Sequence, residues 1–211
     1  MATLKRGFSW VIICGCEFHL AQNWWSKLVE LDMSETADTS AEKQEEYLLL
    51  RFLPYVPKNE VGATYEILLN YIDIHFFGPF LDYLEINYIG TRDHHGITID
   101  NGLFKRETWN VYDRAITAGM KTNNSVKDYH HKLNLFMGNH PSLWRFIFKM
   151  KEFDESIYSD VRQWLKGQVP PGRRTWERAL ARKQRVAQNF DVLQRIHYLR
   201  SVASVLAEAQ F

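Results

Sequence analysis

The sequence predicts a mainly α-helical protein with at most one or two short strands. From residue 19 onward, apolar residues recur at every third or fourth position in most segments, which is the spacing of a helix with one buried face. Only the run SWVIIC at residues 9–14 has the length and composition of a buried strand. With 211 residues, of which 45% are hydrophobic, the chain can form one sizeable core or a core plus an appendage.

The first part of the chain contains two predicted helices separated by a polar loop. Residues 41–53 form one of them, which Pro54 ends because proline disrupts a helix interior. Residues 34–44 are polar and rich in Ser and Thr, which favours a loop at least as far as the start of that helix. The helix before the loop covers residues 19–33, and its apolar stripe is Leu20, Trp24, Leu28 and Leu31.

The middle of the chain contains three more predicted helices. Pro57 is typical of a helix entrance and opens the segment 57–72. The segment 77–90 ends at Gly90, as a glycine that follows the last helical turn would. Residues 91–102 form a polar loop, and 105–116 form a short helix.

The last part of the chain is divided by a linker. A helix within 121–134 and another at 140–158 precede the run VPPG at 169–172, which predicts a boundary between a domain at 1–168 and a segment at 169–211. That segment is predicted to hold a basic helix and a long amphipathic one. The amphipathic stripe consists of Val186, Phe190, Leu193, Ile196 and Leu206.

Charge is distributed unevenly although the formal net charge is only +1. Residues 28–66 contain nine acidic and three basic side chains, whereas residues 162–200 contain ten basic and two acidic ones. An acidic front and a basic rear predict that the C-terminal segment faces an anionic partner.

The two cysteines and the hydropathy indicate in which cellular compartment the protein is expected. Cys14 and Cys16 lie too close together for a comfortable disulfide, which favours the reducing cytosol or nucleus. No run approaches the roughly 18 apolar residues of a membrane span, so no membrane association is expected. The start of the chain mimics a signal peptide but lacks a small-x-small cleavage site, which favours the buried strand.

Six short blocks, in this order, resemble the Mutator-like element (MULE) transposases. They are GCEFHLAQNWW, RFLPYVPKNEV, FLDYLEINYIG, ETWNVYDR, TNNSVKDYHHKLN and NHPSLWRFI, and they extend from Gly15 to about Glu155. The resemblance implies a truncated ribonuclease-H-like fold, of which this chain would hold the helical insertion domain and the last catalytic helix. Intact members use an Asp-Asp-Glu site whose three carboxylates hold two Mg²⁺ ions for phosphodiester cleavage.

This sequence departs from that catalytic pattern. The fourteen residues before Gly15 include no Asp or Glu, so both family aspartates are absent. Lys127 stands at the position of the family glutamate, and a charged ammonium group cannot bind a cation. Asp128 would not replace it, because one residue along a helix turns the side chain by roughly 100°. The chain is therefore not expected to be an enzyme or to need a cofactor.

The other positions that match the family blocks are expected to be structural. In the helix around Lys127, the apolar stripe consists of Val126, Tyr129, Leu133, Phe136 and Met137, and the polar stripe includes His130 and Asn134. The full set of matching positions is Gly15, Cys16, His19, Trp109, Tyr112, Thr122, Asn123, Asn124, His130, Asn134, His140 and Pro141.

A cysteine–histidine pair and several tryptophans are candidates for a zinc site and a nucleic-acid-binding site. Cys16 and His19 have the spacing of half a zinc site, but no second tight pair accompanies them. A buried cysteine and a hydrogen-bonded histidine that fix a strand-to-helix turn are therefore favoured over zinc. Tryptophans could stack on nucleic-acid bases, but their helical spacing beside Leu and Phe favours the core, as does the run RFIFKM around Arg145. The tryptophans concerned are those at positions 24, 25, 109, 144, 164 and 176.

The basic helix is the remaining candidate site. Positions 174, 178, 182 and 185 share one helix face, which could follow the phosphates of DNA without reading its sequence, although a merely solvated face is an equal alternative. The residues predicted to contact DNA are Arg173, Arg174, Arg178, Arg182, Lys183 and Arg185.

Three functions are thus left open by the sequence. The first is an inactive, transposase-derived protein with residual non-specific DNA binding, in the nucleus or else the cytoplasm. The second is a helical interaction module that dimerises through residues 186–206. The third is the C-terminal fragment of a functional DDE transposase with a truncated gene model. Self-association is expected through faces that would pack on an absent sheet, at Trp10, Ile12, Val126 and Leu133.

Overall fold

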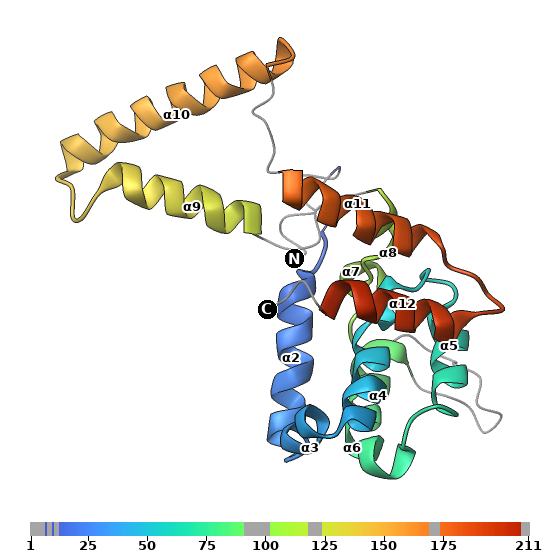
Figure 1. Ribbon diagram of the computed structural model, residues 1–211. Helices are drawn as coiled ribbons and strands as arrows, with labels where there is room; N and C mark the ends of the chain where they lie inside the picture. The colour runs from blue at the N-terminus through green and yellow to red at the C-terminus, as the bar shows by residue number, and fades with distance from the viewer. Residues whose placement is uncertain are drawn as a thin grey trace. The chain divides into compact units, whose positions relative to one another are not determined.

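The computed structural model describes residues 7, 10, 13–90, 102–117, 124–168 and 174–207. Within these residues the chain is helical and contains no strand, so the predicted mainly-α fold is confirmed (Figure 1). The chain divides into two compact units. The first joins residues 1–121 to 180–211, and the second consists of residues 122–179.

The first unit begins with three helices and a short 3-10 turn. Helix α2 spans Glu17–Glu30 and buries the predicted stripe at Leu20, Trp24 and Leu28. Helix α3 covers Ser34–Thr39, and α4 covers Ala41–Arg51 after an N-cap in which Ser40 accepts a hydrogen bond from the Lys43 amide. The turn η1 at Leu53–Tyr55 contains Pro54, which ends α4 as predicted. Helix α3 packs against both α2 and α4.

The middle of the unit continues with short helices. Helix α5 spans Val61–Leu68, and α6 spans Ile74–Leu84 behind an N-cap at Asp73, whose carboxylate accepts from the amides of His75 and Phe76. The π-helix η2 at Glu85–Ile89 prolongs α6 and ends at Gly90. The φ of Gly90 is 107°, which explains a glycine at the predicted helix end. Helices α7 and α8 follow at Arg106–Trp109 and Tyr112–Ile116.

Aromatic side chains from distant segments form the centre of this unit. Trp24 is completely buried, and its ring centroid lies 5.3 Å from that of Tyr88 and 6.5 Å from those of Phe80 and Trp109. Edge-on and tilted aromatic contacts of this kind add to the stability gained by burial. The core prediction is therefore confirmed for Trp24 and Trp109, and Trp25 packs half-buried against the same core.

The end of the chain returns to this unit. Helix α12 spans Arg195–Ala207 and packs on α4 and α5, where the Tyr198 hydroxyl donates to the carbonyl of Tyr55 at 2.6 Å. The compact units divide after residues 121 and 179, whereas the sequence predicts a domain boundary between residues 168 and 169. The amphipathic residues 186–206 contribute to the core through Ile196 and Leu206, whereas Leu193 lies in a turn before α12 and is 89% exposed.

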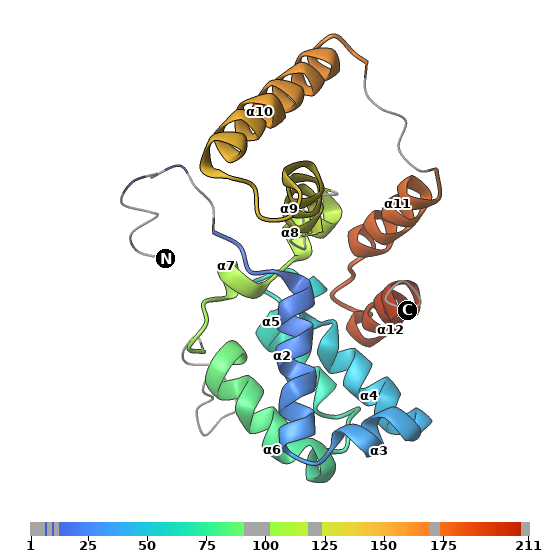
Figure 2. The same ribbon diagram turned by 90° about the vertical axis from the view of Figure 1, so that its left-hand side faces the viewer.

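The second unit is a helical hairpin. Helix α9 spans Asn124–Met137 and α10 spans Leu143–Leu165, and the two lie side by side (Figures 1 and 2). Phe153 of α10 is buried between Tyr129 and Phe136 of α9, at ring centroid distances of 5.4 and 5.5 Å. In the apolar stripe predicted for α9, Met137 is buried and Leu133 is half-buried, whereas Tyr129 and Phe136 contact Phe153 but remain 39% and 37% exposed.

The turn of the hairpin is closed by a lysine. Gly138 and His140 adopt positive φ values of 70° and 45° between the two helices. Lys149 donates from Nζ to the carbonyls of Phe136 and Met137, at 2.6 and 3.1 Å. These carbonyls lack partners within α9 because they belong to its last turn, so the lysine caps the helix.

Three structural predictions are wrong. Trp10, Ile13 and Cys14 form no strand, and Trp10 is 79% exposed, while Ser9, Val11 and Ile12 lie outside the described residues. The predicted loop at 34–44 contains α3, because the buried Ala37 gives that polar segment one apolar contact with the core. The run RFIFKM is not core: α10 packs on α9, and among its described residues Phe153 is the buried one. The exposed aromatic residues of α10 include Trp144, Phe146, Phe148 and Trp164.

Candidate functional site

Helix α11, Arg174–Gln188, carries the predicted basic face. At roughly 100° per residue, positions 174, 178, 182 and 185 fall within about 80° of the helix circumference. The side chains of Arg178, Arg182 and Arg185 are exposed, and Lys183 beside them is half-buried. Arg173 and the side chain of Arg174 lie outside the described residues. The structure therefore places three of the six predicted DNA contacts together on an open helix face.

Other residues, near the end of α11, hold the helix in the first unit. Gln184 and Gln188 both donate to the carbonyl of Ile116, at 2.8 and 3.1 Å. Ala187, between them in the sequence, is 1% exposed. By the same helical geometry Ala187 lies about 180° from the centre of the arginine face, Gln184 about 120° from it and Gln188 about 80° from it. The last two turns of α11 are thus anchored in an orientation that leaves Arg182 and Arg185 toward solvent.

Some of the cations in the basic segment at residues 162–200 are paired with acidic side chains of the same chain. Arg195 pairs with Glu60 at 2.5 Å, and Arg200 pairs with Glu45 at 2.7 Å, so two cations of α12 meet acids of the front segment. Arg178 and Arg185 form no ion pair with any residue that the structure describes. On α11, Arg178 and Arg185 are therefore available to an external anion.

The segment that resembles the last catalytic helix is helical from Asn124. Lys127 lies in its first turn, although its side chain and that of Asp128 are outside the described residues, as are Thr122 and Asn123 entirely. His130 and Asn134 are exposed, which agrees with the predicted polar stripe. His140 is exposed and Pro141 is half-buried at the entrance of α10.

Three of the blocks that resemble the family meet at one place in the first unit. The Gly15 amide donates to the Thr108 carbonyl at 2.5 Å, and a Cβ on Gly15 would lie 2.8 Å from that oxygen, which leaves no room for a side chain. Arg114 donates to the Gly15 carbonyl at 3.1 Å. The Asn110 side chain donates to the Val56 carbonyl at 2.7 Å.

These contacts give the matching residues a structural role. Trp109 is buried in the core, where its Nε1 donates to the Phe104 carbonyl at 3.1 Å. The Tyr112 ring packs edge-on to that of Phe190, with ring centroids 6.3 Å apart. Burial raises the pKa of the Tyr112 hydroxyl above its ordinary value, which keeps the group protonated at neutral pH.

The zinc candidates do not assemble a site. The predicted burial of Cys16 is wrong, because this residue is half-buried at the N-cap of α2. His19 is exposed in the first turn of α2, with its ring 5.6 Å from that of Phe18. In the part of the chain that the structure describes, no three His, Cys, Asp or Glu side chains are grouped to hold a metal ion.

Sequence reasoning missed one buried ion pair. Arg51 Nη2 lies 2.5 Å from Glu17 Oε1, and the two side chains are 5% and 6% exposed. The pair joins α4 to the first turn of α2 across 34 residues of sequence. No local pattern links Glu17 to Arg51, so only the charged residues within apolar runs could have indicated a buried partner.

No known family model, curated protein or solved structure matches this chain. Among the helices that the structure describes, none combines the length and apolar character needed to cross a membrane.

Proposed function

We propose that this chain is a transposase-derived protein without catalytic activity that binds duplex DNA non-specifically through α11. The observation that carries the proposal is the face that Arg178, Arg182 and Arg185 share on α11, where all three side chains are exposed. A row of guanidinium groups at helical spacing can contact successive phosphates, which supply affinity but no sequence information. Such a protein would act in the nucleus.

The test is binding to short labelled duplexes of unrelated sequence at low salt, followed by fluorescence anisotropy. The parent chain is expected to bind all duplexes with similar affinity. A variant with glutamine at positions 174, 178, 182 and 185 should lose most of the binding while its helical circular dichroism is kept, because glutamine is nearly as good a helix former. A strong preference for one duplex, or undiminished binding by the variant, would contradict the proposal.

Inactivity is proposed from Lys127, which stands where the family pattern has its metal-binding glutamate. A charged ammonium group repels Mg²⁺, so the parent should not nick supercoiled DNA in the presence of Mg²⁺. Lys127→Glu alone should not restore nicking, because one carboxylate does not make a two-metal site. A nick that depends on the metal and persists through repurification of the protein would overturn this part of the proposal.

A second candidate function is self-association through the hairpin. Helix α10 exposes large apolar side chains along its length: Trp144 is 78% exposed, Phe148 62% and Tyr158 62%. Exposed apolar surface of this extent is typical of interaction sites. The alternative surface around residues 186–206 is less suited, because Ile196, Leu199 and Val202 are buried in the first unit.

Sedimentation velocity distinguishes this candidate. Replacing Trp144 and Phe148 by serine should convert a concentration-dependent dimer into a monomer. A parent chain that is monomeric at all concentrations would remove the candidate and leave the DNA-binding proposal unaffected.

A further inference from the structure

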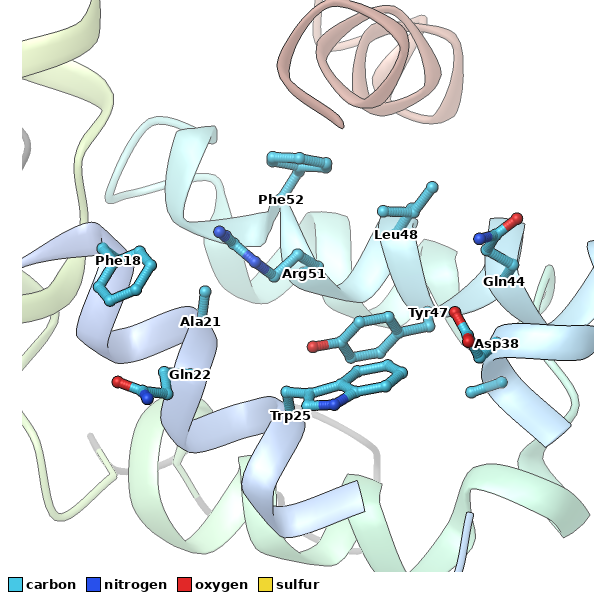
Figure 3. A pocket seen from close by; sticks show the side chains of 11 residues that line it. Phe18, Ala21, Gln22, Trp25, Asp38, Gln44, Tyr47, Leu48, Arg51 and Phe52 are labelled. Atoms are coloured by element: carbon cyan, nitrogen blue, oxygen red, sulfur yellow. The ribbon is translucent and has the colours of Figure 1, made fainter. Parts of the chain in front are cut away.

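A pocket in the first unit lies between α2, α3 and α4. Its volume is about 430 Å³, which is within the range of small-molecule sites. Apolar and aromatic side chains form most of its wall, with Trp25 and Tyr47 on one side of the opening (Figure 3). Their ring centroids are 5.4 Å apart.

Tyr47 supplies a hydrogen-bond donor inside this pocket. The residue is 6% exposed, and its hydroxyl points into the pocket toward Arg51 and Gln22 (Figure 3). Within the described part of the chain, the hydroxyl has no hydrogen-bond partner. Burial, opposed in part by the charge of Arg51, raises the pKa of Tyr47 to about 12, so the hydroxyl remains a donor at neutral pH. A hydroxyl that faces the pocket without a partner in the protein can donate to a ligand that carries an acceptor.

The charges around the pocket select against an anion. Arg51 also lines the pocket: its Nη2 is paired with Glu17 at 2.5 Å, whereas its Nη1 is buried without a partner among the described residues and is a second donor for a ligand oxygen. Asp38 of α3 adds a carboxylate at the exposed rim. Because the pair is neutral as a whole and the rim is negative, a second carboxylate would be repelled rather than bound. An uncharged oxygen acceptor avoids that cost.

We infer that this pocket binds a small, neutral aromatic molecule whose carbonyl-type oxygen accepts a hydrogen bond from the Tyr47 hydroxyl. Trp25 and the apolar wall would cover the ring system, and Tyr47 would fix its orientation. This inference does not depend on the proposed DNA binding, because none of the pocket residues lies on α11.

Three related probes test the inference on the full chain: 2-naphthamide, 2-naphthoate and naphthalene. Binding would be measured by isothermal titration calorimetry and by shifts of the Trp25 indole N–H resonance. The amide is expected to bind most tightly and to shift that resonance. Absence of saturable binding by the amide, or tighter binding by the naphthoate, would overturn the inference.

Two variants locate the site. Tyr47→Phe removes the donor and keeps the ring, so amide binding should weaken by about three- to tenfold while naphthalene binding is unchanged. Ala21→Phe places a ring in the pocket that Ala21 lines and should abolish binding of all probes. Ala63→Phe is the matched control, because Ala63 is exposed on α5 and should bind as the parent does. Equal amide affinity for parent and Tyr47→Phe would overturn the assigned donor, and undiminished binding by Ala21→Phe would overturn the location.

Discussion

Trp24 and Trp144 occupy helices with similar apolar repeats, but Trp24 is completely buried and Trp144 is 78% exposed. Trp24 lies in the first unit, where α2 is surrounded by segments from residues 47 to 109 that supply further aromatic rings. Trp144 lies in α10, whose helical neighbour in its own unit is α9. Periodicity predicts an apolar face, but the number of neighbouring elements determines whether that face is covered.

The cations of α11 and α12 differ in the same way. Arg195 and Arg200 of α12 meet Glu60 and Glu45 because α12 packs on the acidic front of the chain. Arg178 and Arg185 of α11 meet no described acid, because other residues of α11, among them Gln184 and Ala187, make its contacts with the first unit. The excess of basic residues counted in the sequence therefore overestimates the number of cations that are available to a partner.

The largest expected effect concerns the two tryptophans. Trp24→Ala should reduce the free energy of unfolding by about 3–5 kcal/mol, because it removes a fully buried ring. Trp144→Ala should change it by no more than about 0.5 kcal/mol. Urea denaturation followed by circular dichroism measures both. If Trp144→Ala lowered the free energy of unfolding as much as Trp24→Ala does, Trp144 would be buried in solution, and the proposed difference between the two tryptophans would be wrong.

The next effect compares a buried ion pair with an exposed one. Glu17→Gln should destabilise the fold by about 3 kcal/mol, because it leaves Arg51 charged and buried without its partner. Glu45→Gln removes an acid from a pair whose side chains are 54% and 53% exposed, and should cost no more than about 0.5 kcal/mol. The same denaturation experiment applies. Equal costs for the two substitutions would mean that the Glu17–Arg51 pair is hydrated rather than buried.

The smallest expected effect is a pH dependence at the N-cap of α6. Hydrogen bonds from the Phe76 amide and from Lys43 hold the pKa of Asp73 below its ordinary value of 3.8. A carboxylate whose pKa is lowered by folding stabilises the fold above its unfolded pKa, and this contribution is lost as the pH falls through the folded pKa. Thermal melts should therefore show a smaller loss of Tm below pH 4 for Asp73→Asn than for the parent. If the Tm of the two proteins fell equally below pH 4, the claim that the Asp73 carboxylate stabilises the fold as the N-cap of α6 would be contradicted.

The sequence predicted the local features of the fold better than its long-range contacts. Gly90, Pro54 and the stripe of α2 are local, and each predicted its element correctly because capping and helical spacing act within a few residues. The exposure of Trp144 and the docking of α12 on α4 depend on which segments meet in space. The arginine face of α11 was predicted from spacing, whereas the acids that pair with Arg195 and Arg200 could not be.

The pocket and the Glu17–Arg51 pair were not predicted for the same reason. Tyr47 belongs to a helix stripe that reads as ordinary core, and only its position beside Trp25 shows that its hydroxyl faces a cavity. Arg51 likewise ends an amphipathic helix, where a solvated arginine would be expected.

The salt dependence of DNA binding tests the central claim about α11 most directly. About four phosphate contacts predict a slope near −3.6 when the logarithm of the association constant is plotted against that of salt concentration. Glutamine at positions 174, 178, 182 and 185 should remove most of this slope. The matched control replaces four exposed cations of the hairpin unit by glutamine, and it should keep the parent slope: Lys132, Arg145, Lys151 and Lys166. A slope that survives in the α11 variant, or falls equally in the control, would contradict a phosphate-binding face on this helix.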